Sequence, residues 1–233
     1  MIMKLGIMQP YFLPYIGYFQ LINAVDKYVV YDNIEYTKKG WINRNRILMN
    51  GRDFLFSLPL KKDSDYKMVC ERELSSDYHP KKILDQIRSS YMKAPYFNEV
   101  NLLLASIFDT NETNLFKYIF HSVKAINSYM GIHTEMVVSS TIHIDHQLKS
   151  EEKILAICRA LSADTYYNAI GGKELYSKVE FRSSGIDLKF LSSDKIHYQQ
   201  FNHEFVPWLS IIDVLMFNAK EEVSSMLKKY TLQ

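Results

Sequence analysis

The sequence is poor in cysteine and has no cysteine pattern typical of a metal or redox site. Its two cysteines, Cys70 and Cys158, are far apart in the chain, so neither a metal-knuckle spacing nor a redox pair is present. Cys158 falls on the apolar side of a predicted helix and is expected in the core. Cys70 lies in a polar stretch, and no adjacent base in the sequence would activate its thiol for thioester chemistry. We therefore expect no disulfide framework.

Excess charge and long apolar runs are also missing. Lys and Arg number 28 and Asp and Glu 26, so the formal net charge is only +2, far from the basic excess of a general nucleic-acid binder. No stretch approaches the roughly 18 consecutive apolar residues that span a bilayer. The apolar N-terminus is broken by Gln9 and Pro10 before it reaches signal-peptide length. We expect no nucleic-acid partner, no membrane span and a cytoplasmic location.

The chain is long enough for one α/β domain. With 233 residues and 47% hydrophobic content it can bury one full core. An apolar run at 4–8, a helix-length segment at 15–24 and a β-branched run at 27–31 predict a strand–helix–strand unit with parallel strands. The loop after the first strand then lies at the carboxyl edge of the sheet, where ligands of open α/β folds bind. The expected fold is a mostly parallel sheet flanked by helices, as a single domain over residues 1–233.

Turn and capping signals divide the rest of the chain. Asn50 and Gly51 between two apolar runs predict a type I′ hairpin at about 46–60. Three helices follow in a subregion at about 80–131, closed by Gly131, which we interpret as a helical insertion. The later predicted elements are a strand at 135–139, a helix at 150–161 with Ser150 at its N-cap, strands at 165–169 and 186–191, and a helical tail at 208–230 interrupted near Asn218.

Aromatic residues are abundant, with 17 tyrosines and 13 phenylalanines, and several gather after the first predicted strand. Gln9, Tyr11, Tyr15 and Tyr18 surround Gly17 at a helix start. A glycine there lets a ligand approach the backbone, and the free N–H groups of the first turn favour an anion. We predict that these five residues bind substrate. The alternative is a tight strand-to-helix connection against which the tyrosines merely pack.

A basic segment follows the second predicted strand and is expected near the same edge of the sheet. Arg44 has the planar fork that binds a phosphate or carboxylate at two points, and Lys39 adds positive charge. Asn43 is a candidate to bind a sugar hydroxyl or a base edge, and Trp41 to stack on a ring. These four residues are also predicted to bind substrate. A solvated basic loop with one anchoring tryptophan is the alternative.

Two residues are candidate acid–base catalysts. Asp32 ends the second predicted strand, where a carboxylate can accept a proton from an amine, although an aspartate there equally fits a turn cap. His79 precedes a predicted helix start, where a neutral imidazole can serve as a base, although a single histidine is often structural. His143 and His146 lack the further ligands of a metal set, so we expect no metal site.

Two further patterns are weaker. Ser210 and Asp213 lie three residues apart on one face of a predicted helix, where they either support the site or only stabilise the helix. Gly171, Gly172 and Lys173 form a glycine-rich turn after a predicted strand, but this turn lacks the full Walker pattern for phosphate binding.

The longest motifs resemble those of the WbqC-like proteins. Besides His79, the matching strings, which span nearly the whole chain, are QPYFLPYIGYFQLI at 9–22, VVYD at Val29–Asp32, KKGWINRNRI at Lys38–Ile47, YMKAPYF at Tyr91–Phe97, GIDLKF at Gly185–Phe190 and LSIIDVLMFN at Leu209–Asn218. This resemblance implies a link to bacterial surface-polysaccharide gene sets, including those of O-antigen, and to nucleotide-linked amino sugars. It favours a transferase that attaches a small acyl or aminoacyl group to the amine of such a sugar.

A more distant resemblance concerns Tyr15-Ile16-Gly17-Tyr18, which aligns with the HxGH motif of the nucleotidylyltransferase and pantothenate synthetase class. It implies a HUP-like N-terminal unit and ATP chemistry, but tyrosine carries no positive charge at neutral pH, so lysines and arginines of the basic segment would have to supply it. Three hypotheses stay open: a transferase using an acyl thioester or an acyl carrier, an ATP-dependent amide-forming ligase acting through an adenylate, and a non-catalytic binding or scaffold protein. Oligomer formation is left open.

Overall fold

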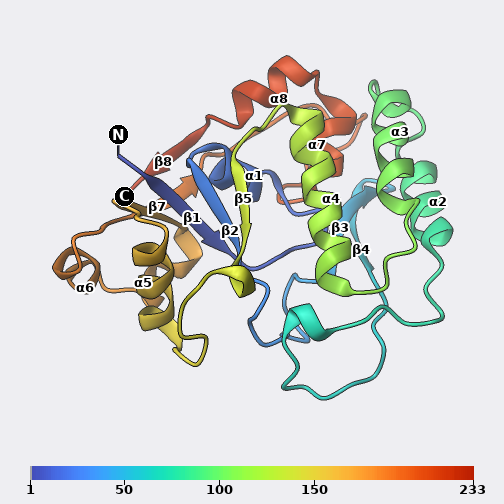
Figure 1. The fold of residues 1–233 in the computed structure, drawn as a ribbon. Coiled ribbons are helices and arrows are strands. Elements are labelled where there is room, and N and C mark those ends of the chain that lie inside the picture. Colours follow the sequence, from blue (N-terminus) through green and yellow to red (C-terminus); the bar gives the residue numbers. More distant parts are fainter. Residues whose placement is uncertain (1) are drawn as a thin grey trace.

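The computed structural model describes residues 2–233 and is built on a six-stranded sheet with helices on both faces (Figure 1). The strand order is β5-β2-β1-β6-β7-β8. All neighbours are parallel except the pair β7 and β8, which confirms the predicted mostly parallel sheet. The strands are β1 (Lys4–Met8), β2 (Lys27–Val30), β5 (Glu135–Val138), β6 (Thr165–Ala169), β7 (Asp187–Ser193) and β8 (Tyr230–Leu232).

The sheet has a topological switch point between β1 and β6, where the order in which the chain adds strands reverses. The chain moves outward from β1 to β2 and β5, and then returns to β6 on the other side of β1. In open α/β sheets this reversal leaves a crevice at the carboxyl ends of the two strands, where ligands bind. The loop that leaves β1 at Gln9 therefore starts at the edge where a site is expected.

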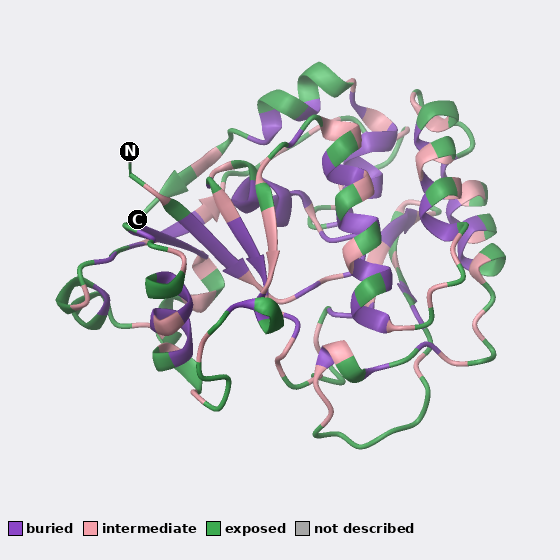
Figure 2. Ribbon diagram, in the orientation of Figure 1, coloured by how far each residue is buried: buried purple, intermediate pink, exposed green. Residues whose placement is uncertain are grey.

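Each face of the sheet has its own core. Figure 1 shows the sheet between two groups of helices, and in Figure 2 the inner strands β1, β2 and β6 are mostly purple, the colour of buried residues. Leu5, Ile7 and Val29 point to the layer formed by two helices, α5 (Ser150–Ala160) and α6 (Lys178–Ser183). The larger core on the other face includes residues of α1 (Ile16–Asn23), α4 (Leu115–Met130), α7 (Ile211–Phe217) and α8 (Lys220–Met226).

The same larger core extends beyond the sheet into a hairpin and two helices. The hairpin strands are β3 (Arg44–Met49) and β4 (Arg52–Ser57), and the helices are α2 (Pro80–Tyr91) and α3 (Phe97–Phe108). Asn50 and Gly51 have φ angles of 52° and 73°, as the predicted type I′ turn requires. Short 3-10 helices lie at Val69–Glu71, Ser139–Thr141 and Ile170–Leu175.

Two sequence predictions about element ends were wrong. Ser150 is the first residue of α5 rather than its cap, and the preceding Lys149 makes no side-chain cap bond. The tail is helical only over α7 and α8, and it ends as β8, which pairs with β7. Tyr230 lies in this strand because the edge of β7 offers it backbone partners, which a helical-periodicity argument does not consider. The interruption at Asn218 is confirmed, since this residue is the C-cap of α7.

A buried carboxylate joins the hairpin, α2 and the tail. Asp213, in the first turn of α7, is fully buried. It accepts hydrogen bonds from the hydroxyls of Tyr91 and Tyr198, each at 2.7 Å, and from the amide of Gln200. The hydroxyl of Tyr91 in turn accepts from the N–H of Leu48 in β3 at 2.8 Å. Because four segments meet at one side chain, its loss affects all of them.

We predict that replacing Asp213 by Asn lowers the free energy of unfolding by about 1–3 kcal/mol, since the asparagine amide confronts the Gln200 amide and leaves a buried donor unpaired. Burial raises the folded-state pKa of Asp213 above its ordinary value of 3.8, against the opposing effect of its three donors. Folding therefore favours the protonated form. The stability margin of the wild type over this non-titrating variant is largest below pH 3.8 and shrinks as the pH rises through the folded pKa. Denaturant unfolding over a pH series measures the margin, and a margin that widens with pH contradicts the prediction.

Candidate functional site

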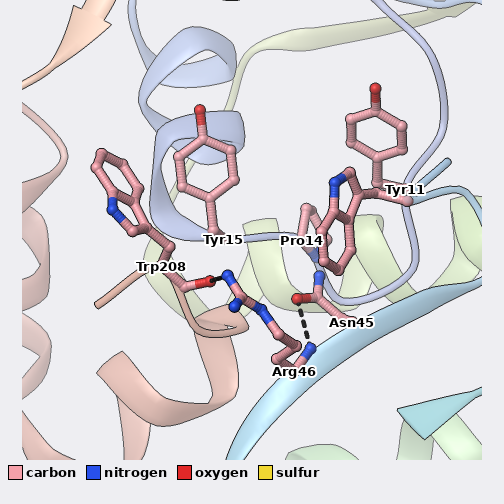
Figure 3. A pocket seen from close by; sticks show the side chains of 7 residues that line it. Tyr11, Pro14, Tyr15, Asn45, Arg46 and Trp208 are labelled. Carbon is pink, nitrogen blue, oxygen red and sulfur yellow. Dashed lines mark hydrogen bonds between the residues drawn. The ribbon is translucent and has the colours of Figure 1, made fainter. Parts of the chain in front are cut away.

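A pocket of about 230 Å³ opens beside the loop between β1 and α1 (Figure 3). Its walls come from three segments that are distant in sequence: the loop after β1, the start of β3 with the residues before it, and the segment before α7. Aromatic rings and one arginine dominate the lining, which consists of Tyr11, Pro14, Tyr15, Trp41, Asn45, Arg46 and Trp208. The structure thus brings together the aromatic and basic segments that the sequence singled out.

Buried hydrogen bonds hold the three segments in place. Leu13, whose φ angle of 46° is in the left-handed region, presents its carbonyl to two donors. The amide Nδ2 of Asn45 in β3 donates to it at 2.8 Å, and the hydroxyl of Ser210 before α7 donates at 2.7 Å. The N–H of Ser210 donates to the carbonyl of Arg46 at 2.8 Å. Because these groups are buried and paired, the pocket walls are fixed without a ligand.

Tyr15 forms the middle of the pocket, and Gly17 makes room for it. A Cβ atom at position 17 would lie 2.3 Å from the Tyr15 ring, so only glycine allows the ring to lie over the first turn of α1. The ring meets Trp208 edge-on, with centroids 6.0 Å apart. Burial raises the pKa of Tyr15, so its hydroxyl stays a neutral hydrogen-bond donor. Gly17 thus admits a tyrosine ring, whereas the sequence suggested that it admits a ligand.

Arg46 supplies the positive charge in the pocket and is incompletely paired. Its Nη1 lies 3.0 Å from the carboxylate of Asp53 on β4, and its Nη2 only reaches the Trp208 carbonyl at 3.5 Å. Its Nε is buried and has no acceptor among residues 2–233. The guanidinium also lies 5.4 Å from the centre of the Trp41 ring, which stabilises the cation there. An arginine with spare donors beside an open cavity is suited to bind an anion.

Of the predicted residues near the N-terminus, Tyr11 and Tyr15 line the pocket and three others do not. Tyr18 is 2% exposed and packs in the core, and burial raises its pKa. Its hydroxyl donates to the carbonyl of Gln9 at 3.1 Å. Tyr18 and Gln9 therefore fix the loop after β1 from behind, and Gly17 acts through the Tyr15 ring.

In the basic segment, Trp41 lines the pocket while its neighbours hold it in position. Nε of Arg44 donates to the carbonyl of Gly40 at 2.8 Å, and its Nη2 donates to the carbonyl of Lys39. Its guanidinium also lies 5.6 Å from the Trp41 ring. Asn43 is buried, donates to a β4-side carbonyl at 2.7 Å and accepts from a tyrosine hydroxyl at 2.8 Å. Lys39 is exposed outside the lining.

The two predicted acid–base residues lie away from this pocket. Asp32 is 2% exposed, and its carboxylate accepts from the Ser139 hydroxyl at 2.8 Å and from the Ser140 N–H and hydroxyl at 2.9 and 2.7 Å. It therefore fixes the turn after β5, as the turn-cap alternative proposed. His79 precedes α2 and lines a separate groove between α2 and β4. In residues 2–233 no group of three His, Cys, Asp or Glu side chains could hold a metal ion.

Three residues of the lining, Pro14, Asn45 and Trp208, were not candidate ligand contacts in the sequence analysis, and Arg46 entered it only as one of the basic residues that would supply positive charge. Asn45 and Arg46 stand in the quoted basic motif. As consecutive residues of β3 they are expected on opposite faces, so periodicity does not predict that both line the pocket. Trp208 lies 162 residues from Arg46 in sequence, and only its rarity gives a signal, since the chain has two tryptophans. Both tryptophans line the pocket.

Comparisons with known proteins show that the three pocket segments all lie within the part of the chain that matches a known family. The model of the WbqC-like protein family matches residues 9–225, which include the whole lining. The uncharacterized protein Rv1507c of Mycobacterium tuberculosis is 28% identical over 230 residues, covering 97% of each chain. No solved structure gave a significant match. Among the described residues, no helix combines the length and apolar character needed to traverse a bilayer.

We predict that Gly17→Ala empties the pocket of the Tyr15 ring without unfolding the protein. The new methyl group would lie 2.3 Å from the end of a mobile side chain, and alanine favours a helix over glycine by about 1 kcal/mol. The tryptophan emission spectrum, which reports on the pocket alone, should therefore shift while the melting temperature holds. Gly171→Ala, where nothing lies within 4 Å, is the matched control. An unchanged spectrum for Gly17→Ala contradicts the assigned role of Gly17.

Proposed function

We propose, from the premise that the chain belongs to the WbqC-like protein family, that it binds a nucleotide-linked amino sugar and transfers a small acyl or aminoacyl group to the sugar amine. This would be a step in the biosynthesis of a bacterial surface polysaccharide. The proposed donor is an acyl thioester, free or on an acyl carrier. The family resemblance motivates the reaction class, and the pocket supplies the physical support.

The observation that carries the proposal is that one pocket combines aromatic rings suited to stacking with an incompletely paired arginine. Trp41 and Trp208 offer flat apolar faces, and Arg46, which lines the same pocket, offers its Nη2, whose contact with the Trp208 carbonyl is long at 3.5 Å (Figure 3). Sugars and bases present flat faces to aromatic side chains, and phosphates accept the planar fork of arginine. The loop that carries Tyr11 and Tyr15 leaves β1 at its carboxyl end, the edge that ligands of such sheets use.

The transfer step needs an acceptor for one proton. The amine nitrogen attacks the thioester carbonyl, the N–C bond forms, the C–S bond breaks, and the amine proton ends on the leaving thiolate. In the proposal Asp53 relays this proton: it does not itself line the pocket, but its carboxylate contacts the lining residue Arg46 at 3.0 Å and its side chain is about half exposed. Asp32 is less suited because its carboxylate oxygens are already bonded, and His79 because it lines another groove.

A second candidate is recognition without catalysis. The seven lining residues include no histidine and no carboxylate, which favours a binding or scaffold protein of the same pathway. A third, an ATP-dependent ligase with a HUP-like N-terminal unit, draws support from the strand order around β1. The ligase is disfavoured because Tyr18, which occupies the position of the second histidine in the HxGH-like motif, is buried and its hydroxyl donates to the Gln9 carbonyl.

The discriminating experiment incubates the protein with amino-sugar nucleotides and acyl thioesters and follows the sugar mass by mass spectrometry. A mass gain equal to the acyl group supports the transferase. Binding of the sugar nucleotide without mass gain supports the recognition protein, and exchange of pyrophosphate into ATP supports the ligase. The outcome that contradicts all three is a folded protein that neither binds nor modifies any member of the panel.

We predict that Arg46→Gln weakens binding of a sugar nucleotide about tenfold or more, because a charge-assisted contact to phosphate contributes about 1.5–3 kcal/mol. Arg52→Gln is the matched control, since Arg52 lies on the same hairpin, is exposed and does not line the pocket. Isothermal titration measures both. Equal affinities of the two variants would remove Arg46 from the proposed site.

A further inference from the structure

Trp208 has an unfavourable backbone conformation that its packing does not explain. Its φ angle is 60°, in the left-handed region that side chains other than those of Gly, Asn and Asp rarely adopt. The residue is 57% exposed, and its ring meets only the edge of Tyr15 among aromatic neighbours in residues 2–233. A large apolar side chain that is both strained and exposed is unlike a core residue, for which burial offsets the strain.

Hydrogen bonds at and after Trp208 hold the backbone in this conformation. Immediately after Trp208, the N–H of Ser210 donates to the Arg46 carbonyl and the N–H of Ile211 donates to the Pro14 carbonyl, each at 2.8 Å. The carbonyl of Trp208 itself faces the Arg46 guanidinium at 3.5 Å. Strain that persists because neighbouring contacts over-determine the backbone is found preferentially at ligand-binding positions.

The strained residue completes a pocket with a second exposed tryptophan. Trp41 is 42% exposed and Trp208 57%, and both border the cavity that contains Arg46. Figure 3 shows the Trp208 indole on one side of Tyr15 and the Arg46 guanidinium beneath them. The volume of about 230 Å³ is below the roughly 300–1,000 Å³ of pockets that enclose a whole drug-sized ligand. It suits one ring and its substituent.

We propose that Trp208 is held in this conformation to form a wall for a single ring that carries a phosphate, with the phosphate at Arg46. The ring is either the base or the pyranose of a larger ligand, and the rest of that ligand extends out of the pocket. This inference deepens the proposed function and rests on the same pocket, but it concerns binding alone. It holds whether or not group transfer follows.

The first test uses the two tryptophans as reporters. Trp41→Phe leaves Trp208 as the single tryptophan of the chain, and its emission is titrated with uridine monophosphate, glucosamine 1-phosphate and inorganic phosphate. A saturable change with uridine monophosphate assigns the pocket to a base, and one with glucosamine 1-phosphate assigns it to a sugar. No change with either ring phosphate, in a protein shown to be folded, overturns the proposal. A response to inorganic phosphate alone also overturns it, since the ring is then not recognised.

The second test separates the ring from the backbone strain. Trp208→Ala and Trp208→Gly both remove the indole and should weaken binding of the responding probe about tenfold, as loss of one stacking face does. Only glycine relieves the positive φ, so Trp208→Gly should melt about 2–4 °C above Trp208→Ala. Trp208→Phe should retain most of the affinity because it keeps an aromatic face.

Ser162 provides the matched control. It also has a positive φ, of 53°, and is exposed in the turn after α5, outside the lining. Ser162→Gly should melt above Ser162→Ala by a similar interval, and both should bind the probe as the wild type does. If Trp208→Ala binds the probe as tightly as the wild type, Trp208 does not form a wall of the ligand site. If Trp208→Ala and Trp208→Gly melt at the same temperature, the backbone at this position is not strained. Probe binding without any acyl transfer supports this inference and counts only against the transferase.

Discussion

The buried carboxylate of Asp213 is the constraint on which the pocket depends. It accepts three hydrogen bonds from neutral donors and forms no salt bridge within residues 2–233, so its charge is stabilised only if all three donors stay in place. Those donors come from α2 and from the segment that leads to Trp208, and Tyr91 extends the network to β3. Three residues earlier, Ser210 binds the loop after β1 and the carbonyl of Arg46. The start of α7 therefore joins three segments of the pocket, namely the loop after β1, β3 and the segment of Trp208.

This arrangement explains how strain can persist at the pocket. Leu13 and Trp208 both have positive φ angles, and both are next to residues held by the first turn of α7 or by β3. Strained residues of this kind cost free energy that the surrounding contacts must offset. A network of buried hydrogen bonds does so more reliably than apolar packing, because its geometry is directional. The pocket is thus rigid before a ligand arrives, which lowers the entropy cost of binding.

The sequence predicted what local signals determine and missed what distant contacts determine. The hairpin turn at Asn50 and the parallel strands follow from turn chemistry and periodicity, which act within a few residues. Residues of the aromatic and basic segments meet at one pocket, yet these residues divide between lining and support. Tyr18 is a buried residue of α1, whereas Tyr15 is the N-cap, whose extended backbone lies outside the helical periodicity, and the sequence alone does not tell at which residue the helix begins. Trp208 joins the site only through tertiary contacts of Ser210 and Asp213.

The distribution of polar groups indicates what the pocket is built to do. Two residues predicted for the site are used to hold loops: Asp32, a candidate catalyst, fixes the turn after β5, and Arg44, a candidate substrate contact, fixes the chain before β3. Aromatic faces and the partly unpaired Arg46 are left facing the cavity. Such a site recognises shape and negative charge strongly but offers little acid–base assistance. If group transfer occurs here, its driving force must come from an activated donor, and the protein contributes mainly by positioning the acceptor.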